Sequence, residues 1–399
     1  MLYDFIIIGA GPAGLFAAAN AGGKVLLLEK MPEPGRKLLL SGSGRCNLTH
    51  QGQIEDFLPF YGKNGNFLRP AFRCLDNLQL MHFFEQRGIG FRGDENGKLF
   101  PEGGSEAVLK VLLEECRKKQ VRIACSERVE KVEKRGMAFS VRTGNIYESK
   151  AVLITTGGKS YPGTGSTGDG YGLAAGLGHD IIEPRPALAP IYVKEYPFSG
   201  LSGISFQDCG ASLWRSGRKI GITHADFMFT HRNLSGPAVM TLSAQALPGD
   251  ELQLCFLPPD QEKRFNCEFF ESVRAAGKKQ LKSVLRESAL PARLVEVIFS
   301  RLGIDQDFKA ADASNKLLES LLNSITRYSL TVEKTGGFNE AMVTAGGVSL
   351  KEIDPNSMQS KIVLGLYFAG EVLDLDGDCG GYNLQAAFST AALAVKANC

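Results

Sequence analysis

The stretch LYDFIIIGAGPAGLFAAANAGGKVLLLE, residues 2–29, decides the fold. Its first seven residues are apolar and rich in β-branched and aromatic side chains, which suits a central parallel strand. Gly9, Gly11 and Gly14 follow at the spacing G-x-G-x-x-G, and an alanine-rich stretch suited to a helix comes next. A second apolar run ends at Glu29. This order predicts a βαβ unit that binds a dinucleotide.

Each residue type in this unit has a physical role. Gly9 permits the tight turn, Gly11 lets the backbone approach a pyrophosphate, and Gly14 lets the helix pack on the strand. The helix N-terminus presents N–H groups and a positive dipole to the phosphates. Glu29 can accept hydrogen bonds from a ribose diol and would repel a 2′-phosphate. The pattern therefore favours FAD or NAD over NADP, with an ordinary glycine-rich turn as the alternative.

The next segment distinguishes the two cofactors. Residues 31–47 read MPEPGRKLLLSGSGRCN, which predicts a turn followed by a glycine-serine loop. Arg36, Lys37 and Arg45 would lie near phosphates, and Ser41 or Asn47 near the ribityl chain and ring. The alternative is a solvated basic loop.

Two distant segments are predicted to hold the same nucleotide. AVLITT at 151–156 is a buried strand that ends in Gly157-Gly158, and residues 361–368 form a strand that runs into Gly370 and Glu371. Glu371 would accept a hydrogen bond from a ribityl hydroxyl. The helix that begins near Asn383 would aim its positive end at the flavin pyrimidine ring, where negative charge gathers on reduction. Because an NAD-only enzyme has no use for this second clamp, FAD is the expected cofactor.

The complete set of predicted FAD contacts follows. It comprises Gly9, Gly11, Pro12, Ala13, Gly14, Glu29, Lys30, Arg36, Lys37, Ser41, Gly42, Gly44, Arg45, Cys46, Asn47, Val129, Thr156, Gly157, Gly158, Gly370, Glu371, Gly381, Tyr382, Asn383, Leu384 and Gln385.

A second G-x-G-x-x-G, at Gly163, Gly165 and Gly168, does not directly follow a strand. We interpret it as a helix start packed beside the flavin. No independent nucleotide-binding half is visible for NAD(P)H.

Length and composition set the outer limits. The chain has 399 residues, 44% of them hydrophobic, and a net charge of +2, which is typical of a soluble globular protein of more than one structural unit. No apolar run approaches the roughly 20 residues that a membrane span needs. Nine scattered cysteines without a C-x-x-C pair, and no signal peptide, favour the cytoplasm over a disulfide framework. No metal-ligand spacing is present.

The expected fold class is α/β. A Rossmann-like, three-layer FAD-binding domain with a central parallel sheet would comprise residues 1–187 and 341–399. An inserted substrate domain would span 188–340. Its β-rich parts are expected at 188–258 and 327–340, and a nested helical subdomain at 259–326.

Taken together, the motifs resemble a known family. GAGPAG, GRKLLLSGSGRCN, TTGGKSYPGTGSTGDGYGLA, FTHRNLSGP, VTAGGV and GLYFAGEVLD with GGYNLQAAFSTA are similar to the BaiN-like family of NAD(P)/FAD-dependent oxidoreductases, within the glutathione-reductase-like flavoproteins. The resemblance covers residues 9–392. It implies non-covalent FAD, NAD(P)H as a transient reductant, and reduction of a conjugated C=C bond. One branch of that family acts on steroid enones, and another forms dihydrouridine in large-subunit ribosomal RNA.

The chain departs from fumarate reductases in one place. Residues 372–379 read VLDLDGDC, which is acidic and lacks arginine, so a dicarboxylate substrate would be repelled.

Reduction also requires a proton donor. Cys46 and His231 are the candidates, with a buried packing thiol and a structural histidine as the alternatives, and Tyr161 and Cys379 are weaker options. Positive charge in the helical region would offer the only phosphate-backbone contact, unless it is a solvated face. The residues that supply it are Arg264, Lys278, Lys279, Lys282, Arg286 and Arg293.

Three functions therefore stay open. The first is an NAD(P)H-driven reductase of a conjugated C=C bond, acting on a small molecule or on uridine in rRNA. The second is an FAD-dependent oxidase of an amine or alcohol. The third is an RNA-binding module stabilised by flavin and without catalysis. No membrane partner is expected, and the sequence leaves the oligomeric state open.

Overall fold

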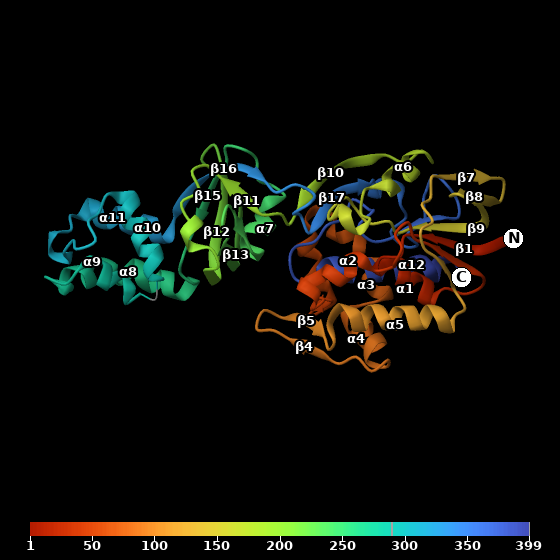
Figure 1. Cartoon of the computed structure of the whole chain (residues 1–399), viewed down its shortest axis with the longest axis horizontal. Helices are drawn as coiled ribbons and strands as arrows, with labels where there is room; N and C mark the ends of the chain where they lie inside the picture. The colour runs from red at the N-terminus through yellow and green to blue at the C-terminus, as the bar shows by residue number, and fades with distance from the viewer. Residues whose placement is uncertain (289, 399) are drawn as a thin grey trace. The chain divides into compact units, whose positions relative to one another are not determined.

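The computed structural model describes residues 1–288 and 290–398; Ala289 and Cys399 lie outside the described residues. Contacts divide the chain into two compact units. Unit 1 comprises Met1–Ala187 and Phe338–Cys399, and unit 2 comprises Leu188–Gly337. Figure 1 labels the elements of both.

Unit 1 is built on a seven-stranded sheet in the order β6-β2-β1-β9-β8-β7, with β18 also paired to β9. Five strands are mutually parallel and two are antiparallel. The parallel strands are β1 (Leu2–Ile8), β2 (Val25–Leu28), β6 (Arg122–Ala124), β9 (Ile146–Ile154) and β18 (Leu366–Phe368), and the antiparallel ones are β7 (Lys131–Arg135) and β8 (Ala138–Arg142). The parallel sheet confirms the predicted Rossmann-like fold.

The middle strand β9 pairs with β1 along one edge and with two strands along the other. Its first half pairs with β8, and its second half pairs with β18 through Leu366↔Val152 and Phe368↔Ile154. The strand expected over residues 361–368 was therefore too long, because only its last three residues join the sheet. Residues 361–365 form a turn in which Ile362 and Val363 donate backbone hydrogen bonds to the Ser360 hydroxyl.

Helices pack on this sheet through small and apolar side chains. α1 (Pro12–Asn20) contacts α5 (Gly104–Lys118) and α12 (Tyr382–Asn398). α1 is almost wholly buried, which explains its alanine-rich sequence. The loop predicted over residues 31–47 is partly wrong, because Arg36–Leu40 forms the short helix α2. A left-handed Gly35 begins α2, and Leu38 packs into the core.

The other elements of unit 1 are short. They are β3 (Thr49–His50), η2 (Ile54–Leu68), α3 (Arg69–Cys74), α4 (Asn77–Glu85), β4 (Phe91–Gly93), β5 (Lys98–Pro101), α6 (Asp169–Ala175), β10 (Ile181–Ala187) and β17 (Val343–Val348), together with the 3-10 turns η1 (Ser41–Gly44), η3 (Pro162–Thr164) and η6 (Leu350–Glu352).

Unit 2 contains a closed barrel in the order β11-β14-β13-β12-β15-β16. The strands are β11 (Ile191–Val193), β12 (Ser205–Arg215), β13 (Arg218–Phe229), β14 (Leu234–Ser235), β15 (Glu251–Leu254) and β16 (Tyr328–Thr335), with α7 (Pro237–Ser243) beside them. The antiparallel strands were predicted, but their closure into a barrel was not. Stacked aromatic rings fill the interior, Phe198 lying 4.0 Å from Phe229 between ring centroids.

The helical part of unit 2 lies between β15 and β16 in sequence. It consists of α8 (Pro259–Ala276), α9 (Leu281–Arg286), α10 (Ala292–Leu302), the 3-10 turn η5 (Ala310–Asp312) and α11 (Asn315–Thr326). A further 3-10 turn, η4 (Ser199–Leu201), lies between β11 and β12. In α11 the buried Leu318, Leu321 and Ile325 recur at helical spacing, as the amphipathic pattern predicts.

Residues 1–288 and 290–398 contain neither a membrane-spanning helix nor a metal-binding cluster. Within these residues no helix combines the length and apolar character needed to cross a membrane. The same residues contain no group of three or more His, Cys, Asp or Glu side chains arranged to hold a metal ion.

Candidate functional site

The glycine-rich turn after β1 shows which glycines the protein itself requires. Gly9 has φ +103°, and a Cβ there would lie 2.7 Å from the Thr155 carbonyl oxygen. A Cβ on Gly14 would lie only 1.9 Å from the Gly9 oxygen. Gly11 differs, because its φ is −79° and a Cβ would meet nothing within 4 Å. No contact within the protein explains this glycine, whereas a ligand lying against the backbone would.

Glu29 is held at the end of β2, beside that turn. One carboxylate oxygen accepts from the Ala10 N–H at 2.8 Å, and the other accepts from the Met31 N–H at 2.9 Å. Each oxygen keeps a further lone pair, so the carboxylate can still accept from a ribose diol. Pro12 and Ala13 form the first turn of α1 over the same site.

The predicted phosphate-binding cations differ from one another in the structure. Lys30 pairs with Asp169 at 2.7 Å, and Lys37 pairs with Glu371 at 2.6 Å. Arg45 is exposed and lies over the Phe100 ring. Both lysines are therefore committed to carboxylates of this chain, so their predicted role at phosphates has to compete with an ion pair. Arg36 is exposed on α2.

The pair of Lys37 and Glu371 joins segments that are 334 residues apart. The second Glu371 oxygen accepts from the Thr344 N–H at 2.9 Å, and a Cβ on Gly158 would lie 2.8 Å from that oxygen. α2, the glycine turn after β9 and the end of β18 therefore meet at one carboxylate. Gly157, which precedes Gly158, has φ +70°.

The C-terminal clamp lies against the N-terminal segments. A Cβ on Gly370 would be 3.1 Å from Ala13 Cβ. The Asn47 side-chain amide, oriented to satisfy both neighbours, accepts from the Gly381 N–H at 3.0 Å and donates to the Thr49 carbonyl at 3.1 Å. α12 begins at Tyr382, and the N–H groups of its first turn lack intrahelical acceptors, as in any helix. They remain available to an electron-rich group.

Three side chains of that helix, all predicted as cofactor contacts, interact with other parts of the protein. Asn383 both accepts from and donates to the backbone of Gly377, at 2.8 and 2.7 Å. Gln385 is fully buried and bonds the Thr49 hydroxyl at 2.6 Å. The Tyr382 ring is stacked between Phe60 and His50. Only the backbone of this turn, with the half-exposed Leu384, faces outward.

The glycine-serine turn Ser41–Gly44 is tightly wound. Gly42, Ser43 and Gly44 all have positive φ, and the Ser41 hydroxyl donates to the Leu38 carbonyl at 2.6 Å. Ser41 therefore orders the turn with its own side chain. Val129, predicted as an FAD contact, is buried after β6.

Three buried hydroxyls have no hydrogen-bond partner among the described residues: Thr156 Oγ1 and Tyr171 Oη in unit 1, and Tyr328 Oη in the barrel of unit 2. Thr156 belongs to the predicted clamp and directly precedes Gly157. Together with open Gly11 and the first turn of α12, this orphaned hydroxyl fits a long polar cofactor such as FAD. Tyr171, on α6, was not predicted as a site residue, although it lies within the motif TTGGKSYPGTGSTGDGYGLA, because its burial arises from the fold.

The two candidate proton donors lie in different units. Cys46 has 0% exposure, and burial raises the pKa of its thiol to about 11, which favours the packing role. His231 is exposed in the turn between β13 and β14 of unit 2. Burial likewise raises the pKa of Cys379, to about 12. Tyr161 caps η3 with φ +56°.

The acidic loop between Glu371 and Tyr382 was recognised in the sequence for its charge, but the raised pKa values of two of its aspartates were not predicted. Burial and then the neighbouring Asp374 raise the pKa of Asp376 to about 6. Burial and then Asp376 raise the pKa of Asp378 to about 6 as well. Carboxylates of ordinary aspartates titrate near 3.9, so this loop holds protons under conditions where most acids are ionised.

The cations of the helical region are mostly neutralised. Arg264 pairs with Glu268 at 2.9 Å, Arg286 approaches Glu296 at 3.6 Å, and Lys282 approaches Asp307 at 3.7 Å. Lys279 similarly approaches Glu287. Among the described residues, Lys278 and Arg293 form no ion pair with a carboxylate. This arrangement is typical of a solvated face, the alternative interpretation of the basic pattern.

The second G-x-G-x-x-G is part of unit 1 packing. A Cβ on Gly165 would lie 2.7 Å from Met31 Cγ, and one on Gly168 would lie 2.8 Å from Lys159 Cγ. Gly163 lies in η3, and Gly168 precedes α6. These contacts agree with a packing role.

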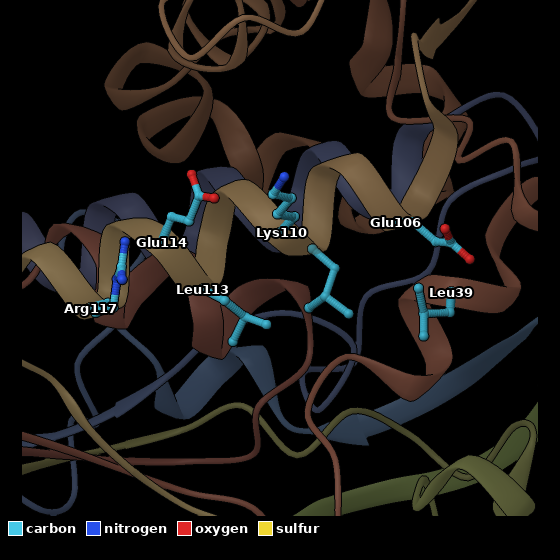
Figure 2. A pocket seen from close by; sticks show the side chains of 7 residues that line it. Leu39, Glu106, Lys110, Leu113, Glu114 and Arg117 are labelled. Carbon is cyan, nitrogen blue, oxygen red and sulfur yellow. The ribbon is translucent and has the colours of Figure 1, made fainter.

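A groove of about 490 Å³ lies elsewhere in unit 1, along α5. Figure 2 shows its lining, in which Leu39 and Leu113 point toward the groove and charged residues follow the helix. The full lining is Leu39, Glu106, Leu109, Lys110, Leu113, Glu114 and Arg117. None of the predicted cofactor residues belongs to it.

Comparisons with known proteins identify the family of the chain. The family described as HI0933-like protein Rossmann domain matches residues 3–397. A ribosomal RNA dihydrouridine synthase of Haemophilus influenzae is 34% identical over 402 residues, covering 97% of this chain and 96% of the relative. A 3-dehydro-bile acid delta(4,6)-reductase of Clostridium scindens is 32% identical, covering 98% of each.

Solved structures share the fold at lower identity. A 3-ketosteroid-delta4-(5alpha)-dehydrogenase of Rhodococcus jostii has a TM-score of 0.53 at 15% identity and covers 100% of this chain and 96% of its own. A flavocytochrome c3 fumarate reductase has a TM-score of 0.51 at 16% identity, covering 100% of this chain and 77% of its own.

Proposed function

Because the chain belongs to the HI0933-like, BaiN-like family of FAD-type oxidoreductases, we propose that it reduces a conjugated C=C bond with electrons from NAD(P)H. The favoured substrate is a uridine of large-subunit ribosomal RNA. Bound and reduced FAD supplies the hydride for such a reduction. The reducing cytoplasm is the expected compartment.

One observation carries this proposal. Segments from α2, the turn after β9 and the end of β18 meet at Glu371. Beside the backbone of Gly11 there is open space, and the buried Thr156 hydroxyl has no hydrogen-bond partner. The turn at Gly9–Gly14 would hold the pyrophosphate, Glu29 the ribose, and the first turn of α12 the flavin ring. Two relatives of comparable identity support the proposal, one a ribosomal RNA dihydrouridine synthase and the other a 3-dehydro-bile acid delta(4,6)-reductase.

The choice between RNA and a small molecule is made on relatedness. The rRNA-directed relatives include a second protein, from Escherichia coli, 32% identical over 394 residues. Cations of α8–α10 lie next to carboxylates of the same region, so the proposal does not depend on a broad basic RNA-binding surface there. Recognition would then depend on contacts near the reacting base.

Anaerobic titration with NADH and NADPH tests the reductase role. We expect one of them to bleach the flavin absorbance near about 450 nm, and an unmodified 23S rRNA transcript to restore it. Mass spectrometry should then find a uridine heavier by two hydrogens. Failure of both nicotinamides, with peroxide released from an amine or alcohol, would instead establish an oxidase.

Gly11→Ala tests the cofactor site with a matched partner. Its Cβ meets open space, so the free energy of unfolding of the flavin-free variant should lie within about 0.5 kcal/mol of the parent's. The variant should nevertheless bind FAD poorly. Gly14→Ala should destabilise the flavin-free fold itself, because its Cβ overlaps the Gly9 oxygen. Equal FAD affinity in parent and Gly11→Ala would contradict the placement of the pyrophosphate.

A further inference from the structure

We infer that Asp376 and Asp378 together form the proton donor of the reaction. This rests on the proposed function, since a C=C bond that accepts a hydride must also gain a proton. Both aspartates lie in the loop between Glu371 and Tyr382, which are the two ends of the C-terminal clamp. Sequence motifs pointed to Cys46 and His231 for this role.

The loop backbone is fixed while the two carboxyl groups are not. Asn64 donates to the Asp374 carbonyl at 2.8 Å, and Asn383 holds Gly377 on both sides. The Asp378 N–H donates to the Phe60 carbonyl at 3.0 Å. In the described structure, no hydrogen bond links the carboxyl oxygens of Asp376 or Asp378 to another residue. Two acids are thus positioned by their backbone and left without a structural partner.

The charges that face the pair keep a proton on it. Asp374 and Glu371 act on Asp376 with like charge, and Arg185 of β10 opposes them. Asp376 in turn acts on Asp378. Beyond Asp378, Lys98 of β5 acts on Cys379. Because the two carboxyls interact, they titrate as one pair that retains a proton near pH 6.

A second observation indicates that a ligand belongs beside these acids. Tyr171 is 7% exposed and its hydroxyl has no partner, yet the charges of Glu371 and Asp374 reach it. A buried phenol without an acceptor costs free energy unless something binds there. Asp374 acts electrostatically on both Tyr171 and Asp376, so its carboxylate lies within electrostatic range of the orphaned hydroxyl and of the pair. A carbonyl conjugated to a C=C bond is the type of acceptor that Tyr171 lacks.

The step balances with what these groups supply. One substrate carbon gains a hydride, whose two electrons come from the reduced nicotinamide dinucleotide by way of the cofactor. The neighbouring carbon gains a proton from the Asp376–Asp378 pair, the C=C bond becomes a single bond, and the pair is left with one more negative charge. Both residues are partly exposed, so water can return the proton.

The first test needs no substrate. In the oxidised holoenzyme, the flavin spectrum should shift with an apparent pKa near 6, because the pair changes charge beside the cofactor. Asp376→Asn and Asp378→Asn should each abolish or move that titration. Asp180→Asn, at an exposed acid of the same unit, should leave it unchanged. A titration that is identical in all four proteins would overturn the inference.

The second test follows the proton itself. Enzyme reduced photochemically without oxygen is mixed with unmodified 23S rRNA transcript or with 4-androstene-3,17-dione, and flavin reoxidation is recorded against pH. Asp376→Asn should slow reoxidation about 100-fold or more, while its reduction by nicotinamide stays within about twofold of the parent. Wild-type-like reoxidation by Asp376→Asn and Asp378→Asn would refute the role. If the parent reduces neither probe, the proposed function fails, and the spectral titration still decides whether the pair exists.

Discussion

Asp250 in the barrel and Asp376 in the acidic loop are both withdrawn from water, but their pKa values move in opposite directions. Asp250 is 3% exposed and accepts two hydrogen bonds from Arg215, each 2.8 Å. These bonds lower the pKa of its carboxyl. Asp376 has like charges for neighbours, and burial raises its pKa to about 6.

The difference shows how a fold uses a buried acid. Where a fork-shaped guanidinium meets a carboxylate, the charge is compensated and the pair joins two strands. Where no partner is provided, the acid costs stability, and such costs concentrate at functional sites. Asp250 is therefore structural, whereas Asp376 is a candidate for chemistry.

Removing the partner of Asp250 should give the largest effect on stability. Arg215→Met leaves a buried carboxylate uncompensated, and we expect a loss of about 2–3 kcal/mol at neutral pH, below the full cost of a buried pair because Arg215 is 39% exposed. Because the pKa of Asp250 is lowered in the folded state, its ion pair stabilises the fold above the unfolded-state pKa, and this stabilisation disappears as pH falls. The destabilisation caused by Arg215→Met should therefore be smaller in acid. Denaturant unfolding measures both. Arg218→Met, on the facing strand and exposed, is the control.

The opposite sign is expected for the acidic loop. Because the folded pKa of Asp376 is raised, its contribution to stability is present below the unfolded pKa and is lost as pH rises through about 6. Asp376→Asn should therefore stabilise the flavin-free protein by about 1–2 kcal/mol near pH 8, and by almost nothing near pH 4. A loss of stability at both pH values would mean that Asp376 has a structural partner after all.

An intermediate case is the ion pair of Lys37 and Glu371. Both side chains are about one-fifth exposed, at 24% and 20%, so the pair is neither solvated nor sealed. Lys37→Met should cost about 1 kcal/mol in the flavin-free protein, since Glu371 keeps its bond from Thr344. Arg36→Met, one residue earlier on an exposed side chain, should change the free energy of unfolding much less. Urea titration of both variants makes the comparison.

The smallest effect belongs to the helical surface. Arg264 and Glu268 are 77% and 56% exposed, and such pairs contribute little in water. Arg264→Ala should change stability by less than about 0.5 kcal/mol. It should also leave the salt dependence of rRNA binding unaltered, measured by filter binding at two salt concentrations. A clear drop in the salt slope would instead make α8 an RNA contact.

Local patterns predicted much of the fold. The parallel strands, the glycine turn and the helix over α1 follow from periodicity and glycine geometry within thirty residues, so they were predictable. The amphipathic α11 and the antiparallel strands of unit 2 were predictable for the same reason. Errors occurred where tertiary pairing decides, as at β18, where only three residues find a partner strand. The helix α2 was missed because its only buried side chain, Leu38, gains its neighbours from the fold.

The candidate site was less predictable than the fold. Motifs located the segments around Glu371, but not that Lys37 would pair with it across 334 residues. Gln385 and Asn383 stood in the right motif, yet the structure gives their side chains bracing roles. Tyr171 lies within a quoted motif, but its orphaned hydroxyl was not predictable, because it depends on burial in the folded protein.

By itself, the sequence determined the type of cofactor turn, since a positive φ at Gly9 and the lack of space at Gly14 are demands that only glycine meets within a short segment. The tertiary structure alone decided which charges are compensated. Asp250 and Asp376 are the same residue type, and their opposite pKa shifts come from burial and from neighbours distant in the chain. The pKa of a carboxyl group depends on its burial and on the charges near it, and folding determines both.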